Sequence, residues 1–223
     1  MRSIIVLLLG VTLVCAGLQP STSVAKVKRR DSQSVLDTPE AHYTQGLKKL
    51  DSGDKKGALE EFQEALNLDT DYPGAYLGFA LLTAGQGKYD EALRNVNTAR
   101  KKSKKWIDVY LTKGRVLVMR EKKNWLKDAL KEYEKARELD NRDDRVAAYE
   151  GEAYWQAGHF QEAENAYSRA IDLKGPMHER AARRFSQDQK ARRASPGTKV
   201  GIRVARLDPV RRGDLCQLLV EEM

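Results

Sequence analysis

The feature that most restricts the fold of this chain is a set of alanines that recurs at an almost constant interval. Ala58, Ala92, Ala129 and Ala163 are separated by 34, 37 and 34 residues, and a second alanine follows each of them by seven. Self-similarity at such a period is typical of proteins built from stacked supersecondary units. The chain is therefore expected to be a stack of similar units.

Other positions follow the same register. An aromatic residue or a valine lies four residues after each first alanine, and a glycine or alanine lies upstream of it. Three units also carry a glycine before the expected second helix, namely Gly53, Gly87 and Gly158. The repeat-defining residues are Gly46, Ala58, Phe62 and Ala65; Ala80, Ala92, Val96 and Ala99; Gly114, Ala129, Tyr133 and Ala136; and Gly151, Ala163, Tyr167 and Ala170.

Each of these positions has a physical reason. Small residues let two antiparallel helices approach closely, whereas a leucine would force them apart or adopt a strained rotamer. The larger side chain between the alanines fills the gap toward the next hairpin. A glycine before the second helix permits a left-handed turn, and Pro73 suits a helix start. The pattern predicts helix pairs at residues 40–52 and 54–68, 73–86 and 88–102, 107–122 and 126–139, and 144–157 and 160–173.

These residues resemble the tetratricopeptide-repeat (TPR) motif, whose period is 34. The resemblance covers about residues 39–174 and implies an all-α fold, a right-handed solenoid of about four TPR helix hairpins. The units span about residues 39–72, 73–106, 107–143 and 144–174. Because a terminal unit needs a polar cover, residues 175–194 are expected to form a capping helix that includes Ala181, Ala182 and Phe185.

The third unit departs from the pattern. Three residues are inserted, and residues 121–125, which end in Trp125, replace the turn glycine. This stretch predicts either a longer loop or a recognition feature centred on Trp125, because loops often carry function.

The TPR resemblance also implies a binding surface, since the first helices of TPR pairs line a concave groove that commonly takes a peptide. The carboxylate clamp of one TPR subclass is not expected, because Tyr43, Leu47, Gly78, Asp108 and Thr112 occupy its positions. The alternative for any of the groove leucines is packing between helices. The expected groove residues are Tyr43, Leu47, Leu77, Leu81, Leu111, Arg115, Glu152 and Trp155.

Charge is distributed unevenly along the chain. The formal net charge is +8, yet residues 39–174 contain 24 basic and 24 acidic residues, so the repeat array itself is neutral. This balance argues against nucleic acid as a partner. One basic run, Arg100 to Lys105, closes the second unit. It is expected to be a solvated helix end, or else a patch for an acidic partner or polymer.

The first 25 residues resemble a secretory signal peptide. A positive start precedes an apolar run from Ile4 to Leu18, and small residues before a cut after Ala25 complete the pattern. The alternatives are a retained membrane anchor and lipidation at Cys15, although Val14 is bulky for a lipoprotein site. We expect export to the periplasm or cell envelope of a bacterium, with residues 26–38 as a basic linker.

Residues 195–223 form a basic tail that is expected to end in an amphipathic helix with Leu215, Leu218 and Leu219. Residues 210–223 resemble part of the first helix of an S-layer homology module. In that family such modules attach proteins to cell-envelope polymers, so an envelope polymer is a second expected partner.

No catalytic, cofactor-binding or metal-binding residues are expected. His42, His159 and His178 share no metal-ligand spacing, and nucleophile and phosphate-loop motifs are missing. The sequence therefore predicts an exported, non-catalytic scaffold that binds a partner protein through an apolar concave groove. The alternative is a structural adaptor attached to envelope glycan through the basic tail. Membrane contact is expected only if the N-terminal segment is retained or Cys15 is lipidated.

Overall fold

This computed structural model describes residues 37–193, which form nine α-helices and no strand. The chain divides into two units, residues 1–34 and 35–223, and all described residues belong to the second. The predicted signal peptide, nearly all of the linker and the C-terminal tail, with its expected helix and S-layer resemblance, lie outside the described residues. The helices are α1 (Pro39–Asp51), α2 (Lys55–Leu68), α3 (Pro73–Ala84), α4 (Tyr89–Lys102), α5 (Ile107–Arg120), α6 (Trp125–Leu139), α7 (Asp144–Ala157), α8 (Phe160–Leu173) and α9 (His178–Arg193).

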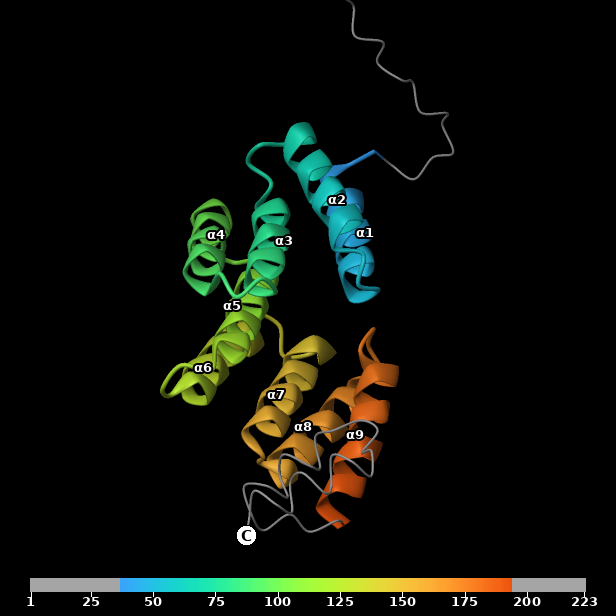
Figure 1. Ribbon diagram of the computed structural model, residues 1–223. Helices are drawn as coiled ribbons and strands as arrows, with labels where there is room; N and C mark the ends of the chain where they lie inside the picture. Colours follow the sequence, from blue (N-terminus) through green and yellow to red (C-terminus); the bar gives the residue numbers. More distant parts are fainter. Residues whose placement is uncertain (1–36, 194–223) are drawn as a thin grey trace, which may run out of the picture. The chain divides into compact units, whose positions relative to one another are not determined.

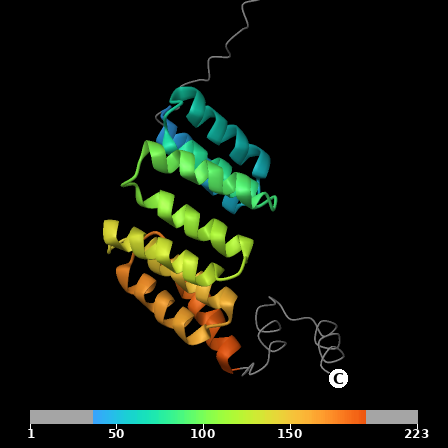
Figure 2. The same cartoon turned by 90° about the vertical axis from the view of Figure 1, so that its left-hand side faces the viewer.

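The helices form four antiparallel hairpins that stack in chain order, followed by α9 (Figures 1 and 2). The first helices α1, α3, α5, α7 and α9 contact one another in succession, whereas the second helices of the described residues do not contact each other. Helices on the inside of a curved stack lie closer together than those on the outside. The first helices therefore form the inner face, and the predicted all-α solenoid of four hairpins with a closing helix is confirmed.

The hairpins are held together by pairing small residues with large ones. An added Cβ at Gly114 would lie 2.2 Å from the ring of Tyr133, and one at Gly46 would lie 2.4 Å from Phe62. The larger residue between the two alanines of each unit is fully or almost fully buried; these residues are Phe62, Val96, Tyr133 and Tyr167. In the second unit, where the first helix carries the larger Ala80, the partner position holds the smaller Val96. The repeat-defining alanines are buried, as expected for close helix packing.

The turns within the hairpins differ between the third unit and the other three. Gly53, Gly87 and Gly158 adopt φ values of 86°, 78° and 80°, which confirms the expected left-handed turns. In the third unit Glu121 and Asn124 take positive φ instead. The longer turn places Trp125 at the start of α6, where the indole packs half-buried against the apolar cluster of the third unit. The insertion is therefore a loop, and Trp125 is anchored against the core.

Helix α9 closes the last hairpin. Ala181 is 1% exposed, and Met177 and Phe185 pack against the apolar cluster of the fourth unit. Asp144, the first residue of α7, accepts a hydrogen bond from the Met177 backbone N–H at 2.6 Å. Burial raises the pKa of Asp144, although this hydrogen bond acts in the opposite direction. The contacts fix the α8–α9 turn against the start of α7.

Candidate protein-binding surface

Four of the eight residues expected to line the groove lie in the core instead. A side chain without accessible surface cannot contact a partner, so these positions stabilise the stack, and the packing alternative holds for the three leucines among them. They are Tyr43, Leu77, Leu81 and Leu111, with exposed fractions of 6%, 0%, 4% and 3%.

Leu77 and Leu111 belong to the apolar clusters of their own units, and Tyr43 takes part in a polar contact that joins three units. The Tyr43 hydroxyl of α1 donates to Asp108 Oδ2 of α5 at 3.3 Å, and Arg145 Nη1 of α7 donates to Asp108 Oδ1 at 2.7 Å. We call Tyr43, Asp108 and Arg145 the inner latch. It joins α1 to α5 across α3, whose inward positions are small (Gly74) or buried (Leu77). The inner face of the second unit is therefore closed by its neighbours.

The electrostatics of the inner latch keep both of its donors protonated. Burial alone would lower the pKa of Arg145, but hydrogen bonds to Asp143 and the charge of Asp108 outweigh it and raise that pKa. Burial and the Asp108 charge raise the pKa of Tyr43, which keeps the hydroxyl protonated as a donor. Sequence reasoning missed this contact. Asp108 and Arg145 are each the second residue of a first helix, and this shared register is the signal that could have predicted it.

The other four expected residues keep part of their surface. Leu47 is half-buried against the apolar cluster of the first two units. The Arg115 guanidinium lies 5.0 Å from the centre of the Tyr149 ring, a cation–π distance. Glu152 forms an ion pair with Arg180 of α9 at 2.8 Å. Trp155 stands edge-on to Phe160, with ring centres 5.1 Å apart.

Charged side chains of four inner helices influence one another on this face. Although burial would lower the pKa of Arg115, the nearby Tyr149, Glu152 and Asp51 contribute to raising it. Asp51 lies at the end of α1, and Glu152 connects onward to Arg180 through its ion pair. The accessible part of the inner face is therefore rich in charge, in contrast to the apolar groove expected from the sequence.

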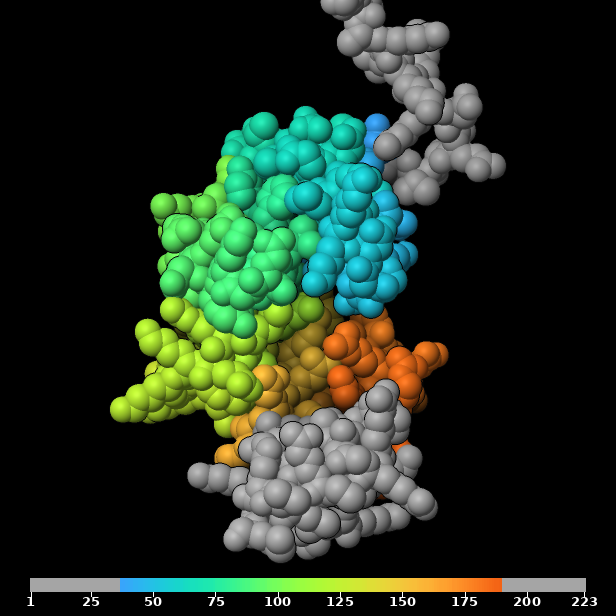
Figure 3. Space-filling view, viewed as in Figure 1, coloured from blue at the N-terminus to red at the C-terminus, as the bar shows by residue number. Residues whose placement is uncertain are grey.

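An open cavity of about 670 Å³ lies between Asp51, the last residue of α1, and the start of α9. Figure 3 shows this side of the molecule hollowed, with α7 (gold) deep between the yellow-green helices and α9 (orange). The cavity brings cations of the α8–α9 turn and α9 opposite the Asp51 carboxylate. Its lining residues are Asp51, Lys174, Gly175, Pro176, Met177, His178, Glu179, Arg180 and Arg183.

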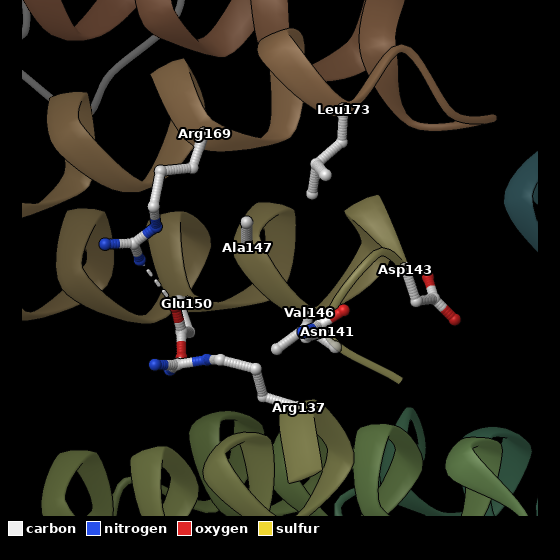
Figure 4. A pocket seen from close by; sticks show the side chains of 8 residues that line it. All are labelled: Arg137, Asn141, Asp143, Val146, Ala147, Glu150, Arg169 and Leu173. Carbon is white, nitrogen blue, oxygen red and sulfur yellow. Dashed lines mark hydrogen bonds and ion pairs between the residues drawn. The ribbon is translucent and has the colours of Figure 1, made fainter. Parts of the chain in front are cut away.

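A smaller cavity of about 130 Å³ lies between α6, α7 and α8 (Figure 4). Arg137 and Arg169 converge there on Glu150, which is 3% exposed. Arg169 Nη2 donates to Glu150 Oε2 at 2.7 Å, and Arg137 Nη2 donates to Oε1. A buried carboxylate needs such partners, and both arginines pair with Glu150, while Arg137 also pairs with Glu134 at 3.0 Å. The residues around this cavity therefore serve the packing of the third unit against the fourth.

The described histidines take part in local contacts. His42 lies between Asp37 and Glu61, His159 stacks on Tyr154, and His178 Nδ1 lies 3.0 Å from the Ile171 carbonyl oxygen. Within residues 37–193, no group of three or more His, Cys, Asp or Glu side chains is placed to hold a metal ion. No helix in this part of the chain is long and apolar enough to span a membrane.

The fold has counterparts among solved structures, although no protein-family profile and no curated protein sequence matches the chain. TTC0263, a thermophilic TPR protein of Thermus thermophilus, is 20% identical, with a TM-score of 0.57 over 82% of this chain and 96% of that one. YrrB, a TPR protein with an unusual peptide-binding site, is 19% identical, with a TM-score of 0.41 over 82% and 91%. MamA 41-end from Desulfovibrio magneticus RS-1 is 20% identical, with a TM-score of 0.42 over 70% and 96%. The likeness to TTC0263 shows that the described residues have the TPR solenoid fold.

Proposed function

We propose that this chain is a non-catalytic scaffold that binds a partner protein on its inner face, in the cavity between α1 and α9. The observation that carries the proposal is the cavity itself, which is bounded by the first and last inner helices and lined by charged side chains. A partner segment seated there would contact Asp51, Lys174 and Arg183 together. Such a contact would span the whole stack.

The exposed charges of the cavity favour a polar peptide segment over an apolar helix. Lys174 is exposed and has no ion pair among the described residues, and the Arg183–Glu179 pair is long at 3.7 Å and exposed. Exposed pairs of this kind contribute little to stability, so a ligand carboxylate can replace the partner at small cost. Arg180, in contrast, also lines the cavity but is already paired with Glu152 of α7.

The test is capture of a partner by the immobilised protein, compared with two double variants. Lys174→Glu/Arg183→Glu reverses two charges in the cavity, and Lys127→Glu/Lys131→Glu makes the same change on exposed positions of α6. We expect the cavity variant to lose the captured protein and the α6 variant to retain it. Equal capture by all three proteins would exclude the cavity as the partner-binding site. Leu77 and Leu81 are unsuitable for this test, because glutamate in the core would disrupt folding.

We further propose that the scaffold works outside the cytoplasm, in the periplasm or envelope. The support is the positive start and apolar run of the first 25 residues. Expression in a bacterial host, fractionation and N-terminal sequencing test this proposal. A mature protein that begins at Lys26 in the periplasmic fraction is expected, and an intact chain in the cytoplasm would contradict export.

A further inference from the structure

The end of the second unit carries an unusual density of positive charge. Between Ala92 and Ile107 the chain has six lysines or arginines and no acidic residue. We define the basic loop as Arg100, Lys101, Lys104 and Lys105, at the end of α4 and in the turn to α5. All four are exposed, and none forms an ion pair within residues 37–193.

The equivalent turns in the neighbouring units have the opposite chemistry. Asp69 Oδ1 accepts the Asp71 backbone N–H at 2.8 Å after α2, and Asp140 Oδ1 accepts the Arg142 N–H at 2.9 Å after α6. Asp side chains stabilise turns in this way. The turn after α4 holds Ser103 at this position and continues with Lys104 and Lys105. Ser103 thus takes the place of the two aspartates, and Lys104 and Lys105 follow where the neighbouring turns have Thr70 and Asp71 or Asn141 and Arg142.

Helix electrostatics account for only part of the basic loop. Arg100 and Lys101 lie in the last turn of α4, where the helix dipole favours cations. Lys104 and Lys105 precede the first turn of α5, where the same effect disfavours cations. Local stability therefore does not explain these two lysines.

The backbone of the basic loop is nevertheless held in place. The Tyr110 hydroxyl donates to the Lys104 carbonyl oxygen at 2.8 Å, as the Tyr76 hydroxyl donates to that of Thr70 one unit earlier at 3.0 Å. A fixed backbone reduces the conformational entropy that is lost on binding. The loop thus presents its charges from an ordered turn.

We infer that the basic loop is a docking surface for an acidic protein segment with several consecutive carboxylates. Carboxylates border the basic loop in both neighbouring turns: Asp71 pairs with Lys102 on one side, and Asp140 and Asp143 flank Arg142 in the next turn. A nucleic-acid duplex or a membrane would need a broader basic face and would meet these carboxylates. A short acidic segment fits between them. This inference does not depend on the inner-face cavity.

The experiment measures binding of fluorescein-labelled hexaglutamate to the full chain by fluorescence anisotropy at low salt. Lys104→Glu/Lys105→Glu is compared with Lys122→Glu/Lys123→Glu, which makes the same charge change in the exposed α5–α6 turn. The two sites are separated by the 14 residues of α5, about 21 Å. Melting curves establish that both variants fold.

We expect the Lys104/Lys105 variant to bind at least about tenfold more weakly and the Lys122/Lys123 variant to remain within about twofold of the unaltered protein. Equal weakening in the two variants would assign the effect to net charge and overturn the proposal. The proposal also fails if the unaltered protein does not bind hexaglutamate, or if it binds duplex DNA or phosphatidylserine vesicles more tightly.

Discussion

Gly114 and Tyr133 illustrate how single residues determine the spacing of the helices. A Cβ on Gly114 would lie 2.2 Å from the Tyr133 ring, and Gly151 and Tyr167 repeat this arrangement at 2.6 Å. The second unit solves the same packing problem with Ala80 and Val96, both fully buried. The two positions therefore compensate each other in volume, as packing at crystal-like density requires.

This compensation predicts a non-additive pair of substitutions. Gly114→Ala should lower the free energy of unfolding by about 1–3 kcal/mol through overpacking, and Tyr133→Val should lower it by creating a cavity. The double variant, which imitates Ala80 and Val96, should be less destabilised than the sum by about 1 kcal/mol or more. Urea unfolding followed by circular dichroism measures all four corners of the cycle. Simple additivity would show that the two positions are not coupled.

At the scale of the element, the α1–α2 hairpin depends on a histidine between two carboxylates. His42 Nδ1 lies 2.6 Å from Glu61 Oε2, and Nε2 lies 2.8 Å from Asp37 Oδ1. Lys49 Nζ donates to the other Glu61 oxygen at 2.7 Å. Burial alone would lower the pKa of His42, but the two carboxylates outweigh it and raise that pKa. The doubly protonated ring satisfies both acceptors.

The hairpin should therefore become less stable as the pH rises. The folded-state pKa of His42 is raised above 6.5. Its contribution to the free energy of unfolding is therefore fully present below pH 6.5 and is lost as the pH rises through the raised pKa. The pKa of Glu61 is lowered despite its burial, so its contribution is lost only in acid. The stability lost in His42→Gln should be larger at about pH 6 than at about pH 8.5.

The exposed His159, 3.7 Å from Glu162, provides the control. The unfolding free energy of His159→Gln is measured across the same pH range as the comparison for a histidine outside this cluster. A constant difference between His42→Gln and the unaltered protein at every pH would contradict the bridging role of His42.

At the scale of the whole described array, curvature decides which residues a partner can reach. The inner latch of Tyr43, Asp108 and Arg145 joins the first, third and fourth units, and α3 of the second unit contacts both α1 and α5. An accessible, charged part of the inner side is the cavity between α1 and α9. The expected residues of the second unit are buried, so the candidate site lies at the cavity instead of on α3.

Removal of the central carboxylate should release α1. Asp108→Ala leaves the buried Tyr43 hydroxyl without its acceptor, and we expect a loss of about 1–3 kcal/mol. Hydrogen exchange of the α1 amides should become faster by about tenfold or more, while α8 remains protected. Asp128→Ala, an exposed position of α6, is the matched control. Unchanged exchange in α1 would show that the latch does not hold this helix.

The sequence by itself determined the repeat, its hairpins and the small–large packing positions, because these depend on contacts within a unit and on a short, regular spacing. The sequence also predicted the turn conformation, because the glycines before the second helices, Gly53, Gly87 and Gly158, adopt the expected left-handed φ. The closing helix and its buried Ala181 were predictable for the same reason: an exposed apolar end needs a cover.

Only the tertiary structure decided which first-helix residues are accessible. Leu77 and Leu81 occupy inward positions of α3, but the approach of α1 and α5 buries them. The same inner helices are joined by Asp108 and Arg145, which are 37 residues apart, and by Tyr43, 65 residues before Asp108. Curvature is the sum of such contacts between units, and a pattern within one unit cannot report it. The position of the candidate site follows from the curvature.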